Sequence, residues 1–194
     1  MIPLSLSLRN FLSYGEGVPT LDFTQFRIAC LTGDNGHGKS ALLDAITWAL
    51  WGWARGHRYG QGGSSPDELV HQGQSDMEVS LEFLAEGANY RVLRKYSRGS
   101  RGRSSSIILD LQAAAGDGYR SLSEGATSDT ERRIQHLLGM DYETFINSAF
   151  LLQGQADRFT ASTPSKRKET LAEILGLSLF ERLEDRAREQ VRER

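Results

Sequence analysis

The sequence is poor in cysteine and proline, with one Cys and four Pro among 194 residues. A single cysteine excludes a disulfide framework and a cysteine-based zinc site. Neither sign of charge dominates, because 23 Lys and Arg face 25 Asp and Glu. Bulk attraction to nucleic acid is therefore not expected, and any such binding must come from a local patch. Long apolar runs are also missing, since the longest one, residues 41–53, is interrupted by Asp44 and Gly52, which excludes a membrane-spanning helix.

Hydrophobic residues make up 39% of the chain, a composition typical of a globular domain with a sizeable core. The N-terminus lacks the charged start, apolar region and cleavage site of a secretory signal peptide, because its leucines alternate with serines up to Arg9. We therefore expect a cytoplasmic protein. The single cysteine, Cys30, lies in the apolar run 28–31 and is expected to be a small buried residue.

Hydrophobic periodicity predicts a succession of strands and helices. Strand patterns occur at residues 4–8, 18–23, 26–31, 77–83, 90–96, 107–111, 119–122 and 149–152. Helix patterns occur at residues 42–50, 65–70, 128–139, 142–147, 164–175 and 178–191. Three of the helix starts carry a Ser-x-x-Glu capping box, at Ser65, Ser128 and Ser178. The order predicts an α/β fold whose middle third is an antiparallel sheet.

Residues 33–40 fit the pattern G-x-x-x-x-G-K-[ST] of a P-loop. The pattern follows an apolar segment and opens an amphipathic helix, the setting in which backbone N–H groups and a helix N-terminus converge on phosphate oxygens. Lys39 is expected to contact the β- and γ-phosphates, and the Ser40 hydroxyl to bind Mg²⁺. The sequence therefore predicts a nucleotide site, with a purely structural glycine turn as the alternative.

Hydrolysis also needs a carboxylate that holds the metal and a group that orients water. Asp110 ends an apolar run, but Leu111 follows it where ATPases of this kind usually carry Glu. Its place among antiparallel hairpins is also wrong for that role, so a solvated strand residue is the better interpretation. No Leu-Ser-Gly-Gly stretch is present. The sequence thus contains a nucleotide cradle and lacks much of the catalytic apparatus.

Several stretches together resemble the N-terminal ATPase segment of the SbcC family, SMC-like ABC ATPases that work with the SbcD nuclease in double-strand-break repair. They are residues 8–14, 33–46, 150–155 and 164–176. The resemblance implies the N-terminal lobe of an ABC-type head at residues 1–177, with an antiparallel β subdomain, and the base of a coiled coil at residues 178–194. An ordinary amphipathic helix is the alternative for the last segment, because only about two heptads are visible.

In that family the glutamine at the position of Gln153 forms the Q-loop and reaches Mg²⁺ and the water beside the γ-phosphate. Gln153 and Lys39 are therefore the expected catalytic residues, and Ser40 and Gln153 the expected metal ligands. Motif and resemblance together predict that the nucleotide is bordered by Arg9, Asn10, Ser13, Asn35, Gly36, His37, Gly38, Lys39, Ser40, Ala41, Leu69, Val70 and His71. Some relatives carry Arg at the position of Leu12 and Ser or Thr at that of Ala41, so two polar phosphate contacts are missing here.

A basic cluster lies in the predicted hairpin 90–96 and the loop after it, with no Asp or Glu between residues 90 and 103. Such residues contact DNA phosphates, and family members bind duplex DNA. The predicted DNA contacts are Arg94, Lys95, Arg98, Arg101 and Arg103, extended by Lys166 and Arg167. A solvated basic loop is the alternative. Tyr90 and Tyr96 are expected to be packing residues.

The family's signature motif, carboxylate strand and switch histidine belong to a C-terminal lobe beyond a long coiled coil, and none of them occurs in these residues. The resemblance implies four partners at the nucleoid: that lobe, a second head joined through ATP, an SbcD-type nuclease and double-stranded DNA. The alternatives are another SMC- or RecN-type ATPase, and a structural nucleotide-binding module that does not hydrolyse ATP. The charged end at Arg194 suggests that the sequence stops at the root of the coiled coil of a longer protein.

Overall fold

The structure is a computed structural model. It describes residues 1–54, 57–58, 65–99, 104–116, 118–123, 125–148, 163–174 and 188. The chain divides into two compact units, residues 1–138 and residues 139–194. The first unit holds the P-loop sequence and the antiparallel hairpins.

A six-stranded sheet is the frame of the first unit, with the strand order β2-β1-β5-β6-β7-β8 and antiparallel pairing throughout. The strands are β1 (Ile2–Arg9), β2 (Leu21–Asp22), β5 (Asp76–Ala85), β6 (Ala88–Ser97), β7 (Ser106–Ala115) and β8 (Gly118–Ser121). The predicted hairpin of residues 77–83 and 90–96 is confirmed, because Met77 lies opposite Tyr96 and Phe83 opposite Tyr90. Clear alternation over adjacent segments is enough to fix such a pairing.

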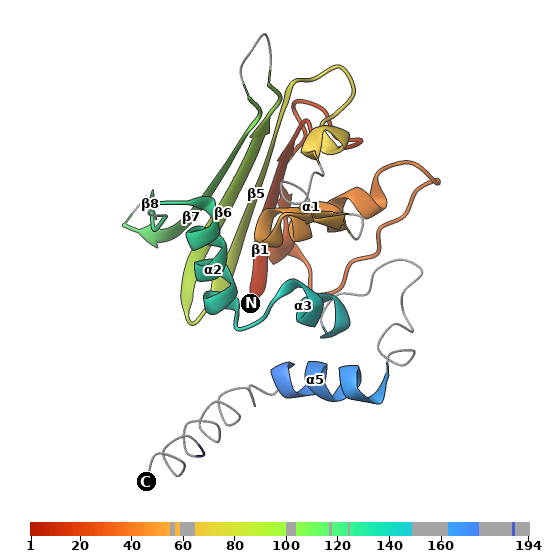
Figure 1. The fold of residues 1–194 in the computed structure, drawn as a ribbon. Coiled ribbons are helices and arrows are strands. Elements are labelled where there is room, and N and C mark those ends of the chain that lie inside the picture. The colour runs from red at the N-terminus through yellow and green to blue at the C-terminus, as the bar shows by residue number, and fades with distance from the viewer. Residues whose placement is uncertain are drawn as a thin grey trace. The chain divides into compact units, whose positions relative to one another are not determined.

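One face of the sheet forms the core under α1 (Lys39–Trp51) and α2 (Thr127–Leu138), which Figure 1 shows in front of the strands. Alternation along β5 buries Met77, Val79, Leu81 and Phe83 on this face. The other face carries the polar residues of the same strands. Helix α1 ends as predicted at Gly52, which adopts φ 73° and donates its N–H to the Trp48 carbonyl at 2.9 Å.

The remaining elements are short. The first unit contains the 3-10 helices η1 (Phe23–Gln25) and η2 (Pro66–Leu69) and a separate two-stranded ladder of β3 (Trp53–Ala54) and β4 (His57–Arg58). The second unit contains α3 (Tyr142–Ser148), which packs against α5 (Pro164–Ile174). Across the part of the chain that the structure describes, no helix has the length and apolarity needed to cross a membrane.

Residues 26–31 do not form the predicted buried strand. Phe26, Ile28 and Leu31 are 39%, 92% and 47% exposed, and Cys30 is exposed as well, so the expected burial of the cysteine is also wrong. No strand among the described residues pairs with this segment. An apolar run becomes a buried strand only where a neighbouring strand and a covering layer are available, and the described residues provide neither.

The capping box predicted at Ser128 does not form, because α2 begins one residue earlier and Ser128 lies inside the helix. Glu131, the last residue of that box, instead pairs with Arg94 of β6. The end predicted for this helix is confirmed, since Gly139 has φ 66° and follows Leu138 directly. The strand predicted at residues 149–152 lies outside the described residues, as do residues 178–194 apart from Arg188.

Candidate nucleotide site

The loop before α1 is built around three glycines with positive φ. Gly33, Gly36 and Gly38 adopt φ values of 142°, 87° and 82°, which side chains with a Cβ rarely allow. The loop curls back so that the Lys39 ammonium group donates to the Gly33 carbonyl at 2.7 Å and to the Asp34 carbonyl at 2.8 Å. The positive charge of Lys39 is thereby held beside the backbone at the start of the loop.

The N-terminus of α1 lies in the same loop. Gly38 is its N-cap residue, no side chain caps the helix, and no acidic residue occupies the first turn. The first N–H groups of a helix generally lack a partner inside it and carry partial positive charge, although that of Ala41 here donates to the Gly38 carbonyl at 3.0 Å. Together with the Lys39 ammonium group and the exposed Ser40 hydroxyl, they form a donor set that fits the phosphate tail of a nucleotide with its Mg²⁺ ion.

Two segments far apart in the sequence join beside this loop. Phe11 and Val70 form an isolated antiparallel bridge, and the Leu12 N–H donates to the Leu69 carbonyl at 2.7 Å. The turn at residues 10–15 also contacts the P-loop, because Ser13 lies beside Gly38: a Cβ placed on Gly38 would be 3.2 Å from that of Ser13. The structure therefore brings together most of the predicted nucleotide residues.

His71 fixes this junction with its ring as well as its backbone. The His71 N–H donates to the Asn10 carbonyl at 2.9 Å, and the ring Nδ1 lies 2.7 Å from the Leu12 carbonyl. Because a carbonyl only accepts, Nδ1 must carry a proton. The sequence predicted only that His71 borders the nucleotide, and the ring contact joins residues too far apart for a local pattern to reveal.

Asn10 and Leu12 both have left-handed backbone in this turn, with φ values of 53° and 50°. Asn10 is also fully buried, and neither its Oδ1 nor its Nδ2 has a hydrogen-bond partner in the described structure. Unpaired buried amides and left-handed backbone both cost free energy, and such features gather at functional sites. The position agrees with the placement of Asn10 at the site.

Arg9, in contrast, is paired with residues of the neighbouring strand β5. It follows Leu8 of β1 and therefore lies on the opposite face of the sheet from the one that α1 covers. Its guanidinium group is hydrogen-bonded to Asp76 and lies 3.9 Å from Glu78. The hydrogen bond to Asp76 is the main reason why the pKa of Arg9 is raised. The predicted contact of Arg9 with the nucleotide stays a prediction.

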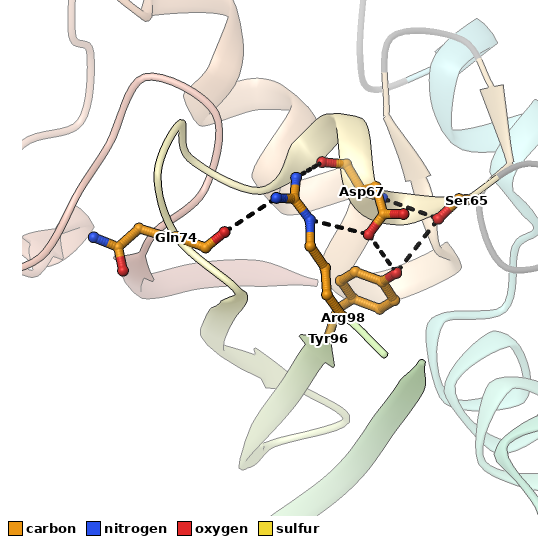
Figure 2. Close-up of polar contacts among 5 residues, drawn as sticks. All are labelled: Ser65, Asp67, Gln74, Tyr96 and Arg98. Carbon is orange, nitrogen blue, oxygen red and sulfur yellow. Dashed lines mark hydrogen bonds and ion pairs between the residues drawn. The ribbon is translucent and has the colours of Figure 1, made fainter. Parts of the chain in front are cut away.

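A polar network holds the segment that carries residues 69–71 (Figure 2). The Tyr96 hydroxyl donates to Asp67 Oδ1 at 2.7 Å, and Arg98 Nε donates to the same oxygen at 3.1 Å. Arg98 also donates to the carbonyls of Asp67 at 2.7 Å and Gln74 at 3.2 Å, while the Ser65 hydroxyl accepts from the Asp67 N–H. The hydrogen bond from Tyr96, followed by weaker effects that include the Arg98 charge, lowers the pKa of Asp67. The end of β6 thus anchors η2 and the loop after it.

The basic cluster is smaller than predicted, because Arg94 is buried. It is 2% exposed and donates to the Ala49 carbonyl at 3.1 Å and to Glu131 at 3.2 Å. The prediction that Arg94 contacts DNA is therefore wrong. The alternation of β6 places residue 94 on the same face as Val92 and Tyr96, both fully buried, and this is the signal that sequence reasoning missed.

The other basic residues differ in their surroundings. Lys95 is ion-paired with Glu78 at 2.8 Å and Arg98 with Asp67 at 3.1 Å. Arg167 is half-buried near the start of α5, in the second unit. Arg101, Arg103 and the side chain of Lys166 lie outside the described residues, as does the predicted catalytic Gln153.

Asp110 is engaged inside the sheet. It accepts hydrogen bonds from Ser121 at 2.6 Å and Gln112 at 2.7 Å, which agrees with its interpretation as a strand residue rather than a metal ligand. The described residues contain no group of three His, Cys, Asp or Glu side chains that could hold a metal ion. The metal prediction therefore depends on Ser40 and on Gln153.

The glycine loop, its lysine and the uncapped helix define a P-loop nucleotide-binding domain of mixed α/β fold. A family model described as an AAA domain matches residues 5–193, so the chain belongs to this family. Over its whole length it is homologous to the N-terminal part of SbcC and Rad50 ATPases, at about 30% identity. The chain is thus an AAA-type P-loop domain that is similar, over its whole length, to the N-terminal segment of these much longer relatives.

The similarity extends to bacterial and archaeal relatives. The chain is 35% identical over 194 residues to the SbcC component of the nuclease SbcCD of Deinococcus radiodurans, covering 100% of this chain and 20% of that protein. It is 32% identical over 189 residues to a probable DNA double-strand break repair Rad50 ATPase of Aquifex aeolicus, and the match covers 97% of this chain and 18% of that protein. It is 29% identical over 195 residues to the Rad50 ATPase of Methanocaldococcus jannaschii, and the match covers 100% of this chain and 17% of that protein. The chain spans a fifth or less of the length of these relatives.

Proposed function

We propose that this chain is the Mg·ATP-binding half of an SMC-like ABC ATPase head that acts in double-strand-break repair. The observation that carries the proposal is the glycine loop at residues 33–40, with the Lys39 ammonium group over it and the uncapped N-terminus of α1 behind it. Bound Mg·ATP would supply a phosphoanhydride bond whose hydrolysis changes the state of the head.

Each part of the site has a distinct role in this proposal. Lys39 holds the phosphate tail as a point charge, Ser40 offers a hydroxyl ligand to Mg²⁺, and the glycine backbone approaches the phosphates closely. The turn of residues 10–15 and the segment 69–71 border the remainder of the nucleotide. Gln153 is proposed as the residue that orients water and completes the metal coordination, by the family resemblance alone.

A second lobe is part of the proposal because the segment before the loop is uncovered. Phe26, Ile28 and Leu31 expose apolar side chains next to Gly33, and exposed apolar clusters mark surfaces that another element covers. The relatives are at least five times longer than this chain. We therefore expect a C-terminal lobe to pack on residues 26–31 and to provide the carboxylate that hydrolysis needs.

The proposal is tested by measuring ATP turnover with and without that lobe. The 194-residue chain is expected to bind Mg·ATP weakly and to hydrolyse it poorly, because the described residues lack a metal-binding carboxylate cluster. Adding the lobe should raise turnover, and Lys39→Ala in the two-lobe protein should abolish the rise. Robust turnover by the chain alone would contradict the two-lobe arrangement, and none by the two-lobe protein would favour a structural module.

The wider assembly is proposed from the family. One relative is described as part of the nuclease SbcCD, so we expect an SbcD-type nuclease as partner. We also expect ATP to join this head to a second copy, and hydrolysis to separate them. ATP would then be a ligand that selects the joined state, and the nuclease would respond to that state.

DNA binding is proposed at the loop after β6, with Arg101 and Arg103 as its central residues. Lys95 and Arg98 are less available, because each is already paired with a carboxylate. Replacing Arg101 and Arg103 by Gln should weaken duplex DNA binding and lower the slope of log affinity against log salt by about two, one unit for each lost phosphate contact. Fluorescence anisotropy at several salt concentrations measures both quantities.

Arg91→Gln is the matched control for this experiment. It removes one positive charge from β6, half of what the double change removes, and Arg91 is paired with Glu82 at 2.6 Å and its guanidinium carbon lies 3.8 Å from the centre of the Tyr119 ring. Its salt slope should stay near that of the unmodified protein. A change in slope of about half that of the double variant would show that net charge alone matters and would remove these two residues from the proposal.

A further inference from the structure

Tyr14 contacts the P-loop at the residue that precedes the lysine. Its hydroxyl lies 3.2 Å from the Gly38 carbonyl and donates a hydrogen bond to it. The same carbonyl accepts from the Ala41 N–H at 3.0 Å, so both of its lone pairs are used. Burial raises the pKa of the Tyr14 phenol, and the hydroxyl therefore stays protonated and remains a donor at neutral pH.

The Tyr14 ring also packs directly on the Gly38 backbone. A Cβ on Gly38 would lie 3.2 Å from Tyr14 Cε2 and 3.3 Å from Cζ, closer than ordinary van der Waals contact. The φ of 82° at Gly38 independently favours glycine. Contact and hydrogen bond together define where this peptide unit can lie.

The turn that carries Tyr14 is itself anchored to the core. The Tyr14 N–H donates to the Phe11 carbonyl at 2.9 Å, and the Asn10 N–H donates to the Gly15 carbonyl at 3.2 Å. Phe11 is fully buried, and its ring centre lies 5.6 Å from that of Trp48 of α1. Tyr14 is therefore held in place from the sheet and α1, without help from the glycine loop.

The direction of the Gly38 carbonyl determines the direction of the next N–H. A trans peptide unit is planar, and its C=O and N–H bonds point in opposite directions. A carbonyl that points at Tyr14 therefore aims the Lys39 N–H away from Tyr14. That N–H belongs to the first turn of α1, whose donors make up the proposed phosphate site.

The geometry points to Tyr14 as a positioning residue of the phosphate site, which acts by orienting the Gly38–Lys39 peptide toward the nucleotide's phosphates. This inference rests on the proposed function. It assigns Tyr14 no direct contact with ATP, and its effect should reach any ligand that carries the polyphosphate group, whatever base is attached.

The test is Tyr14→Phe, which removes one hydroxyl and keeps the ring packed on Gly38. Calorimetry on the complete protein should show the affinities for Mg·ATP and for Mg·tripolyphosphate falling by the same factor, about three- to tenfold for one neutral hydrogen bond. The thermal midpoint without ligand should change little. Tyr90→Phe is the control, because Tyr90 stacks on Phe83 within the sheet and should leave both affinities unchanged.

The possible results separate cleanly. Unchanged affinities in Tyr14→Phe would overturn the inference, and so would a loss for Mg·ATP without a loss for tripolyphosphate, which would place Tyr14 beside the nucleoside. If Lys39→Ala binds both ligands as well as the unmodified protein does, the proposed function fails first. An effect of Lys39→Ala with none of Tyr14→Phe contradicts only the role of Tyr14.

Discussion

Lys39→Ala is expected to lower the affinity of the complete protein for Mg·ATP by about 10- to 150-fold. The range corresponds to the loss of a charge-assisted hydrogen bond to phosphate. Lys39 is the residue that the loop is shaped around, since its ammonium group lies within 2.8 Å of two loop carbonyls. Isothermal titration calorimetry with Mg·ATP measures the change directly.

The control for this experiment is Lys95→Ala. Lys95 is ion-paired with Glu78 on the outer face of the sheet, and its loss removes the same charge without touching the loop. Its affinity for Mg·ATP should match that of the unmodified protein. If Lys39→Ala behaves like this control, the loop is not the nucleotide site, and the proposed ATPase function loses its basis.

Arg94→Ala is expected to lower the free energy of unfolding by about 3 kcal/mol, the lower end of the range found when one member of a buried ion pair is removed. The Glu131 side chain is only 15% exposed and would lose its ion pair with Arg94. The Ala49 carbonyl, in the last turn of α1, would lose its donor. The substitution would also remove the contact of the guanidinium group with the Trp48 ring, whose centre lies 5.9 Å from the guanidinium carbon.

Urea unfolding of the chain measures this effect, with Arg91→Ala as the matched control. Arg91 and Glu82 are 34% and 27% exposed, and a pair of that kind contributes less than about 1 kcal/mol. The double variant Arg94→Met with Glu131→Leu should recover most of the lost stability, because no charge is then left unpaired. If Arg94→Ala lowers the free energy of unfolding no more than Arg91→Ala does, the buried pair contributes little to stability.

Much of the first unit could be predicted because its signals are local. The hairpin of β5 and β6 follows from alternation in two neighbouring segments and the turn between them, and Gly52 marks the end of α1 within a single turn of helix. The P-loop was equally clear, since eight consecutive residues carry both its pattern and its chemistry. In each case the interacting residues are close in sequence.

The errors came from features that depend on distant residues. The run at residues 26–31 is apolar enough for a buried strand, but burial requires a partner strand that the described residues do not provide. Arg94 is the exception, because the alternation of β6 already places it on the buried face, although its partner Glu131 is 37 residues away. The contacts of Asp67 with Tyr96 and Arg98 span about 30 residues, and periodicity carries no information on such pairs.

Helix α1 is fastened at both ends, by Tyr14 at Gly38 and by Arg94 at Ala49. Its donors are therefore preorganised, and an arriving nucleotide does not have to meet the entropic cost of ordering the helix. Contacts at both ends also oppose tilting of the helix. Under the proposed function we therefore expect a mechanical response to ATP to begin in the glycine loop and in residues 26–31, which lead into it.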